Sequence, residues 1–416
     1  MSASPTSPIP PISPDEHRRR ILEAIEPMAA FPQPLMDALG LACAVDVHAR
    51  VSLPSFDNSA MDGYAVRFAD VTGATETDPA VLPVVGEIGA GTARVHALAP
   101  GTAVKIMTGA PVPAGADTIV PYEVTDRGVS QVRIAEAPRS AGVHVRRTGE
   151  DVATGDLVVG AGTVLSPRHL ALLAATGHAA VPTRPRPRVV VISTGSELRE
   201  PGQPLGHDSI YDSNSYLLAA AARAAGAIAF RVGIVPDDPH GFRTALHDQL
   251  VRADLVITSG GVSQGDFDVV KEALSSDGVW FGPVAMQPGK PQGFGLVGEE
   301  QVPIFCLPGN PVSSFVSFET FVLPALRRLM GLAPEARPAV GARLKTETGA
   351  PMRSPEGRRQ YMRGRYADGV VTPFGGPASH ILGGLAGANC LIVVPEDVTT
   401  VAPGATVEVL LIEDAF

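Results

Sequence analysis

The stretch from Arg188 to Arg327 decides the fold of this chain. It holds three apolar runs, RVVVIST (188–194), ADLVITSGGVSQGDFD (253–268) and PIFCLPGNPVSSFVSF (303–318), and each run breaks into a turn rich in Gly or Pro. A short β-branched run predicts a strand buried on both faces, and the Ser, Thr, Asp or Asn after each turn suits a helix start. Repeated strand–turn–helix units predict an α/β fold in which helices cover both faces of a parallel sheet.

The polar residues of these turns are expected to converge, because such sheets bind ligands beyond the carboxyl ends of their strands. TGSEL (194–198) places Glu197 just past the first strand, where it can cap amides, bind a metal or hydrogen-bond a ribose; capping is the commoner role. Similarly, IYDSNS (210–215) places Asp212 or Ser213 as the N-cap of a helix. Asp237 lies between prolines in VPDDP, at another turn.

SGGVSQGDFD (259–268) is the sharpest local indication of a ligand site. Gly260 and Gly261 allow close backbone approach to a ligand, and Ser263 adds a hydroxyl donor. Asp266 and Asp268 supply oxygens that suit a hard cation such as Mg²⁺. The alternative is a plain Gly turn with a capping Asp. The number of ligand-type residues within this one turn favours a ligand site.

Two further loops point to an anion. Lys290 lies between prolines in QPGKP (287–291), which would hold its ammonium in place, although a solvated surface Lys is the alternative. LPGNPVSS (307–314) places Gly309 and the first turn of a helix at the same edge of the sheet, with Ser313 and Ser314 in that turn. Because acids also line the crevice, a divalent cation is expected to mediate phosphate binding. The Walker-type phosphate-binding fingerprint GxxxxGK[ST] is absent from the sequence.

Composition narrows the class of protein. The chain has 416 residues and a net charge of −10, which suggests several domains and argues against a nucleic-acid-binding surface. Cys43, Cys306 and Cys390 are far apart, which fits a reducing compartment and not a thiolate metal site. No apolar run approaches the roughly 18 residues of a membrane span, and the Pro- and Ser-rich start lacks the features of a secretory signal. A cytoplasmic protein is therefore expected.

The remaining segments predict further domains. Residues 15–50 predict two helices with a kinked join at prolines, and SPRHLALLAATG (166–177) predicts another helix. Residues 80–160 and 340–416 carry short β runs between Gly turns, which predict a β-rich module and a small C-terminal barrel or sandwich. Ser379 and His380 form a pair that is more often a polar loop than a catalytic dyad.

The expected division of the chain has five parts. They are a disordered N-terminus (1–14), a helical linker domain (15–50 with 140–181), a protruding β-rich domain (51–139), the α/β domain (182–330) and a C-terminal β domain (331–416).

Two loops in the first half carry polar residues with open interpretations. LPSFDNSAMDGYAVR (53–67) is either a tight turn capped by Asp57 and Asn58 or a ligand-binding loop. KIMTGAPVP (105–113) places Thr108 at a strand end, where backbone amides could face an oxyanion. An ordinary strand-end turn is the simpler interpretation of the second loop.

Taken together, the motifs resemble the molybdopterin molybdenumtransferases, the MoeA family, which includes the E domain of gephyrin. The resemblance rests on FDNSAMDGYAVR, IMTGAPVP, RRTGED, STGSEL, IYDSNS, SGGVSQGDFD, QPGKP and LPGNPVS, which run in the family's order over nearly the whole chain. It implies the last step of molybdenum cofactor assembly, in which molybdate and adenylylated molybdopterin react with Mg²⁺ and AMP is released. It also implies an elongated homodimer.

The resemblance implies roles for individual residues. Catalytic roles fall to Asp62, Thr108, Glu197, Asp237 and Asp268, and Asp237 and Asp268 would hold Mg²⁺. Cofactor binding falls to Gly260, Gly261, Ser263, Lys290, Pro308, Gly309, Pro311 and Ser313. Asp151 of RRTGED is implicated at the far side of the site, and Asp62 and Thr108 would complete the site across the dimer interface. Gln287 stands where some family members carry Lys, which leaves Lys290 as the one cation of that loop.

Other classes remain open at this point. A molybdopterin-binding scaffold is one, and a related adenylyltransferase or pyrophosphatase is another. Enzymes of the second class would lack the motifs at 53–67 and 105–113 and the C-terminal β domain. A molybdopterin adenylyltransferase is expected as a possible substrate donor, and neither nucleic acid nor membrane is expected as a partner.

Overall fold

The computed structural model describes residues 10–91, 97–261, 268–334 and 337–412. These residues form two compact units. Unit 1 consists of residues 1–31, 40–42 and 184–416, and unit 2 of residues 32–39 and 43–183. Among the described residues, no helix has both the length and the apolar character needed to cross a membrane.

Unit 1 contains the expected α/β sheet. Its strand order is β15-β12-β16-β20-β19-β17. The first four strands, β15 (Ile228–Arg231), β12 (Arg188–Ser193), β16 (Leu255–Ser259) and β20 (Val302–Leu307), are parallel. The last two, β19 (Pro291–Val297) and β17 (Trp280–Pro283), run antiparallel to their neighbours. The prediction of a parallel α/β sheet is confirmed, with an antiparallel edge that the sequence did not suggest.

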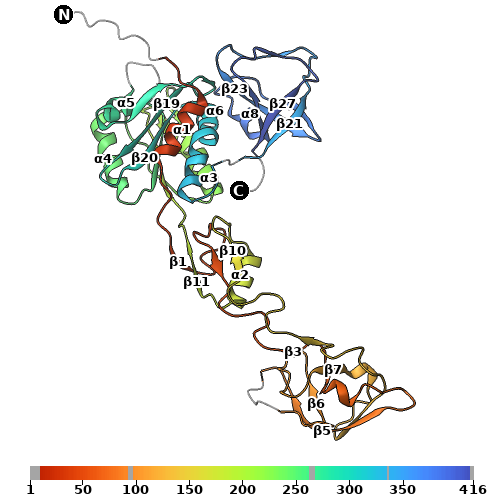
Figure 1. Ribbon diagram of the computed structural model, residues 1–416. Helices are drawn as coiled ribbons and strands as arrows, with labels where there is room; N and C mark the ends of the chain where they lie inside the picture. Colours follow the sequence, from red (N-terminus) through yellow and green to blue (C-terminus); the bar gives the residue numbers. More distant parts are fainter. Residues whose placement is uncertain (1–9, 92–96, 262–267, 335–336, 413–416) are drawn as a thin grey trace, which may run out of the picture. The chain divides into compact units, whose positions relative to one another are not determined.

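Helices cover both faces of this sheet, as Figure 1 shows. Alternate residues of β12 enter different cores: Val189 and Val191 join one cluster, Val190 and Ile192 the other. The first cluster packs against α1 (Pro14–Ala24), α3 (Asn214–Ala224), α6 (Pro311–Ser317), the π-helical turn η4 (Phe318–Val322) and α7 (Leu323–Leu329). The second packs against α4 (Pro239–Leu250) and α5 (Val269–Leu274). Burial on both faces explains why these strands are apolar throughout.

The C-terminal part of unit 1 is a small barrel. Strands β23 (Arg359–Ala367), β24 (Val370–Pro373), β21 (Ala339–Leu344), β27 (Thr406–Leu411) and β25 (Cys390–Val394) follow one another, and a β23–β25 pairing closes the circle. A short strand of the α/β part, β18 (Met286–Gln287), adds to β23 in parallel. The barrel alternative for this region is therefore confirmed.

Unit 2 contains a five-stranded sheet and a smaller module. The sheet order is β7 (Thr118–Pro121), β4 (Gly63–Val66), β6 (Ala103–Ile106), β5 (Ala80–Ile88) and β8 (Gln131–Ile134). Beside it, β3 (Asn58–Ser59) pairs with β9 (Val145–Arg146). The smaller module pairs β1 (Phe31–Pro34) with β11 (Ala180–Thr183) and β2 (Val47–His48) with β10 (Leu157–Val159), next to α2 (Pro167–Ala175).

The prediction of two helices over residues 15–50 is half wrong. The first helix exists as α1, and the Ser13 hydroxyl accepts a hydrogen bond from the Glu16 amide at its start. The second does not form, because residues 31–34 become β1. Pro32 and Pro34 lack the amide hydrogen that a helix needs, whereas an edge strand tolerates that loss. The Gln33 side chain then anchors the strand by donating to the Thr183 hydroxyl at 2.7 Å.

Candidate functional site

The topology of the sheet places a ligand crevice between β12 and β16. Along the sequence β12 comes first, the next strand of the parallel part, β15, lies on one side of it, and the later strands β16 and β20 lie on the other side. Such a reversal is a topological switch point, where open α/β sheets bind ligands at the carboxyl ends of their strands. Three turns leave the sheet at this edge: residues 194–198 after β12, 260–261 after β16 and 308–310 after β20.

Gly260 lies where these turns approach each other. Its backbone has a φ of +98°, and an ideal Cβ placed on it would lie 2.9 Å from the Thr194 carbonyl oxygen. On the other side, an ideal Cβ on Gly309 would lie 3.7 Å from the Gly260 Cα. Only glycine tolerates both the conformation and the crowding at Gly260. The structure therefore brings the predicted residues Gly260 and Gly309 together.

Asn214, the first residue of α3, ties the turns to one another. Its Nδ2 donates to the Ser259 Oγ at 2.8 Å and to the Gly309 carbonyl oxygen at 2.6 Å. One side chain thus links the ends of β16 and β20 to the helix that follows β12. The sequence analysis had treated Asn214 only as part of a helix start, and its position directly after Asp212 and Ser213 gave no sign of this role.

A buried polar network supports the end of β12. Asp212 accepts hydrogen bonds from the Ser193 hydroxyl at 3.2 Å and from the amide and the hydroxyl of Ser215 at 3.0 and 2.6 Å. The Arg231 guanidinium donates to the Ser215 Oγ at 2.7 Å and forms an ion pair with Glu200 at 3.0 Å. The capping role expected of Asp212 is confirmed, and the network fixes the start of α3 relative to the sheet.

The predicted acids have separate local environments. Asp237 accepts a hydrogen bond from the Ser196 amide at 2.8 Å, which brings it to the turn that carries Glu197. Glu197 is exposed and folds back over Gly195. Asp268 occupies the N-cap position of α5, while Ser263 and Asp266 lie outside the described residues. Within the described ranges, no group of three His, Cys, Asp or Glu side chains is arranged to hold a metal.

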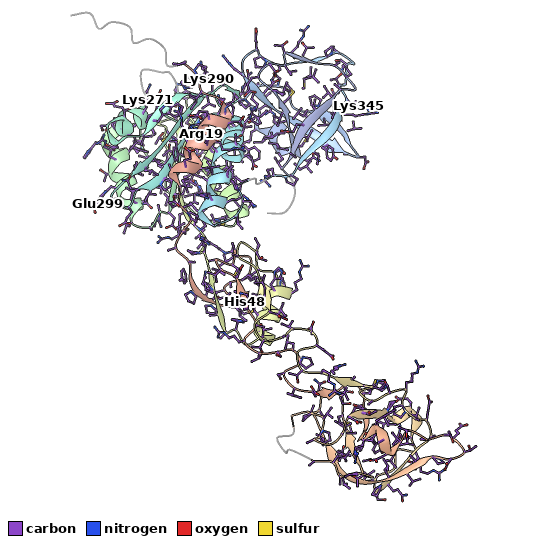
Figure 2. The ribbon with its side chains drawn as sticks, viewed as in Figure 1. Arg19, His48, Lys271, Lys290, Glu299 and Lys345 are labelled. Carbon is purple, nitrogen blue, oxygen red and sulfur yellow. The ribbon has the colours of Figure 1, made fainter. Side chains whose placement is uncertain are left out.

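The start of α6 is already occupied by protein groups. The Ser314 hydroxyl donates to the Pro308 carbonyl oxygen, and the Val312 amide donates to the Ser379 carbonyl oxygen at 3.1 Å. Pro311 is the first residue of the helix and has no amide hydrogen to offer. The anion site expected on the amides of this first turn therefore lacks the Val312 donor. Ser313 is buried in the same turn, and Lys290 is exposed in its loop (Figure 2).

Arg363, which the sequence analysis missed, organises the loop that contacts α6. Its side chain is 2% exposed and donates to the carbonyl oxygens of residues 375, 376, 378 and 381. Burial lowers the pKa of Arg363. The held loop presents the Ser379 carbonyl oxygen to Val312. The strand Arg359–Ala367 reads RQYMRGRYA and carries three arginines, so its sequence did not single out Arg363 as the buried one.

In unit 2, the two predicted catalytic residues contact each other. Asp62 Oδ1 accepts hydrogen bonds from the Thr108 amide at 2.7 Å and from the Thr108 hydroxyl at 2.8 Å. These bonds, the backbone one first, hold the pKa of Asp62 below its usual value. Both residues are exposed at the ends of their segments. Since each unit is described by itself, the expected meeting of this pair with the residues of unit 1 stays a prediction.

Asp57 caps a loop far along the chain and not its own turn, which is where the sequence had suggested a capping role. It accepts from the Thr148 amide and hydroxyl at 2.8 and 2.9 Å and pairs with Arg147 at 2.6 Å. The hydrogen bond from the Thr148 amide is the largest reason that the pKa of Asp57 is lowered. Asp151 is exposed in the same loop, where its amide donates to the Leu53 carbonyl oxygen. The loop at 53–67 is thus a structured turn, and a ligand role for it stays a prediction.

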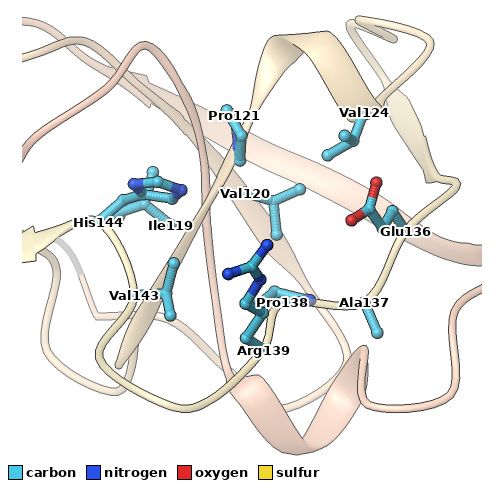
Figure 3. A pocket seen from close by; sticks show the side chains of 10 residues that line it. All are labelled: Ile119, Val120, Pro121, Val124, Glu136, Ala137, Pro138, Arg139, Val143 and His144. Carbon is cyan, nitrogen blue, oxygen red and sulfur yellow. The ribbon is translucent and has the colours of Figure 1, made fainter.

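Unit 2 also holds a pocket of about 370 Å³ beside β7 (Figure 3). Apolar side chains such as Ile119 and Val143 line it together with Glu136, Arg139 and His144. None of the residues expected from the sequence to form the site lines this pocket. Its size alone does not connect it with the crevice at the switch point.

Fold and crevice together define an α/β ligand-binding domain that is joined to a β-barrel and to a β-rich inserted unit. Comparison with known families divides the chain in a similar way. Residues 12–177 match the MoeA N-terminal region (domain I and II), residues 190–328 a probable molybdopterin binding domain, and residues 345–412 the MoeA C-terminal region (domain IV).

Individual relatives agree with these matches. Molybdopterin molybdenumtransferase 2 of Mycobacterium tuberculosis is 49% identical over 95% of this chain and 98% of its own length. The molybdopterin molybdenumtransferase of Bacillus subtilis is 34% identical over 97% and 95%. A crystal structure of the molybdopterin biosynthesis moea protein from Pyrococcus horikosii has a TM-score of 0.84 at 30% identity and covers 97% of this chain and 100% of that one. This chain belongs to the MoeA family.

Proposed function

We propose that this chain inserts molybdate into adenylylated molybdopterin with release of AMP, as the last step of molybdenum cofactor biosynthesis. The observation that carries the proposal is the convergence of three strand-end turns at the switch point, with Gly260 between Thr194 and Gly309. The family membership supports it, because relatives covering nearly the whole chain are named molybdopterin molybdenumtransferases.

The site residues have the chemistry that this reaction requires. The backbone amide of Gly261 and the ammonium of Lys290 suit the phosphates of a nucleotide-linked pterin, whereas the Gly260 amide donates to the Leu307 carbonyl oxygen at 3.1 Å. In unit 2, the hydrogen bonds from Thr108 lower the pKa of Asp62, whose carboxylate can polarise a water molecule or a metal ion. The roles of Glu197, Pro308, Pro311 and Ser313 in binding belong to the same proposal.

Magnesium dependence is part of the proposal. Mg²⁺ is usually bound by one or two carboxylates together with substrate phosphates, so Asp237 and Asp268 are a sufficient protein contribution. Asp237 uses one oxygen for the Ser196 amide, which fixes the orientation of its carboxylate. When bound, the cation would neutralise the pyrophosphate charge and assist departure of AMP. The protein residues would orient the cation and the substrate.

The remaining parts of the proposal concern the assembly and its surroundings. We propose a homodimer in which Asp62 and Thr108 complete the site of the partner subunit, a cytoplasmic location, and a molybdopterin adenylyltransferase as substrate donor. Cys43, Cys306 and Cys390 are all buried and no disulfide joins them, which is compatible with a reducing compartment.

The decisive experiment supplies the purified protein with adenylylated molybdopterin, Mg²⁺ and molybdate and measures AMP by chromatography. AMP release that depends on molybdate is the expected result. Release at the same rate without molybdate would instead indicate a pyrophosphatase, and no release at all would remove the enzymatic proposal.

A pair of neighbouring acids supplies a matched control. Asp237→Ala should lower AMP release at least about 100-fold if the carboxylate helps to hold the cation. Asp238→Ala should lose only the cap that Asp238 gives α4 through the Gly241 amide at 2.7 Å, and turnover should remain. Equal losses in the two variants would contradict the role proposed for Asp237.

A further inference from the structure

Two buried polar atoms at the switch point have no hydrogen-bond partner among the described residues. They are the hydroxyl oxygen of Thr194, directly after β12, and the carboxamide oxygen of Asn214, at the start of α3. Buried polar groups in folded proteins are nearly always partnered, because leaving one unpaired is costly. Two unpaired atoms at one crevice therefore call for an explanation.

The orientation of the Asn214 carboxamide is fixed by its neighbours. The group that approaches the Gly309 carbonyl oxygen at 2.6 Å must be the NH₂, because a carbonyl oxygen can only accept. The second amide hydrogen is directed to the Ser259 Oγ at 2.8 Å. Both hydrogens are thus used within the protein, and the Oδ1 remains an acceptor with no donor among the described residues.

The Thr194 hydroxyl is buried against a glycine. Thr194 is 5% exposed, and an ideal Cβ on Gly260 would lie 3.3 Å from its Oγ1. Any side chain at position 260 would cover this hydroxyl. Because Asn214 bonds to Ser259, the residue before Gly260, both unpaired atoms flank the same glycine. The two atoms thus lie near the carboxyl ends of the neighbouring strands β12 and β16.

We propose that Thr194 and Asn214 bind the ligand by hydrogen-bonding to uncharged N–H or O–H groups along one of its edges. The Asn214 Oδ1 accepts from an N–H or O–H group, and the Thr194 hydroxyl donates or accepts beside it. An ionised phosphate offers acceptors only, so it is excluded from this position and lies elsewhere in the crevice. The inference rests on the proposed function, in which the ligand supplies two such edges: the N–H groups of the pterin and the hydroxyls of the ribose.

The substitution Thr194→Val tests this assignment because it removes the hydroxyl and keeps the shape of the side chain. We expect the stability to denaturant to stay equal or to rise, since the removed group has no partner in the protein. Affinity for adenylylated molybdopterin, measured by calorimetry, should fall about 10-fold, the size of one lost hydrogen bond in a buried site. AMP alone and 6-hydroxymethylpterin alone serve as probes, and the probe whose affinity falls identifies the edge that is read.

The control variant is Thr183→Val. The Thr183 hydroxyl is buried and accepts from Gln33 at 2.7 Å in unit 2, so this variant should lose stability and keep its affinity. Asn214→Ala is a less clean test because it also breaks the bonds to Ser259 and Gly309. For that variant a loss of both stability and affinity is expected.

The outcomes separate this inference from the function on which it rests. If the unaltered protein binds adenylylated molybdopterin and Thr194→Val binds it equally well, the inference is wrong and the proposed function stands. A loss of stability in Thr194→Val as large as in Thr183→Val would also overturn the inference, since the hydroxyl would then have a structural partner. Failure of the unaltered protein to bind adenylylated molybdopterin would overturn the proposed function and this inference with it.

Discussion

Replacing Arg363 should release the loop at 374–381 without unfolding the barrel. The guanidinium donates to four carbonyl oxygens of that loop, and in Arg363→Met all four lose their donor while the apolar stem is retained. A hydrogen bond to a charged group contributes roughly 1.5–3 kcal/mol. Because water can replace the guanidinium as donor to the loop carbonyls, we expect the free energy of opening the loop to fall by about 3 kcal/mol and not by the sum of four such hydrogen bonds. The loss should be local, because the other strands of the barrel keep their pairings.

Hydrogen–deuterium exchange measures this loss directly. A change of about 3 kcal/mol in the free energy of local opening corresponds to exchange roughly 100-fold faster for amides of residues 374–382. The Val312 amide should also exchange faster, because its acceptor is the Ser379 carbonyl oxygen of this loop. The control is Arg365→Met, which removes an exposed Arg of the same strand that donates to the Gly387 carbonyl oxygen at 2.8 Å and stacks on the Phe374 ring, 3.7 Å from its centroid. Unchanged protection in Arg363→Met, or equal changes in both variants, would refute the role given to Arg363.

Three further predictions concern stability and assembly. Burial lowers the pKa of His17 from 6.5 to about 4, so on acidification the unfolded chain binds a proton before the folded chain does. The unfolding free energy of unit 1 should therefore fall by about 3 kcal/mol between pH 6.5 and pH 4. Denaturant titrations that follow Trp280 fluorescence should show this fall, and His17→Leu should abolish it. Gly260→Ala should lower the unfolding free energy of unit 1 by roughly 1–3 kcal/mol, because position 260 has a φ of +98° and its Cβ position is crowded. A denaturation midpoint equal to that of the unaltered protein would contradict this. The variants Asp62→Ala and Asp268→Ala should each be inactive. If sites are shared across a symmetric dimer, an equimolar mixture of the two variants, dissociated and re-annealed, should regain about a quarter of the AMP release of the unaltered protein. A mixture that stays inactive would argue against shared sites.

The sequence predicted the α/β sheet well because the relevant information is local. Val189 to Ile192 are β-branched and buried on both faces, and the φ of +98° at Gly260 belongs to its own turn. Asp212 caps the start of α3 through the amide of Ser215, three residues away. At these positions local pattern and local geometry agree, whereas the hydrogen bonds of Asp57 to Thr148 are a distant contact.

The parts that the sequence did not predict depend on distant contacts. Asn214 is distinguished by bonds to residues 259 and 309, and Arg363 by a loop that folds back over the strand that carries it. The second helix expected over PLMDALGLACAVDV (34–47) does not form: residues 35–40 are turns that follow β1, whose partner strand lies at 180–183. Pairings between residues so far apart are set by tertiary structure, which periodicity and motif spacing do not encode.

The sequence order of unit 1 has a consequence for how the protein is made. Helix α1 is synthesised before unit 2, yet its residues Ile21 and Ile25 are buried in a core with Phe321 and Leu326, which lie beyond it in the chain. On the ribosome, unit 2 can therefore complete its own folding while the apolar face of α1 is still exposed, because the helices that cover it have not yet been synthesised. A ribosome that stalls between residues 183 and 321 would carry a folded inserted unit and an uncovered N-terminal helix, which is a ready target for a chaperone.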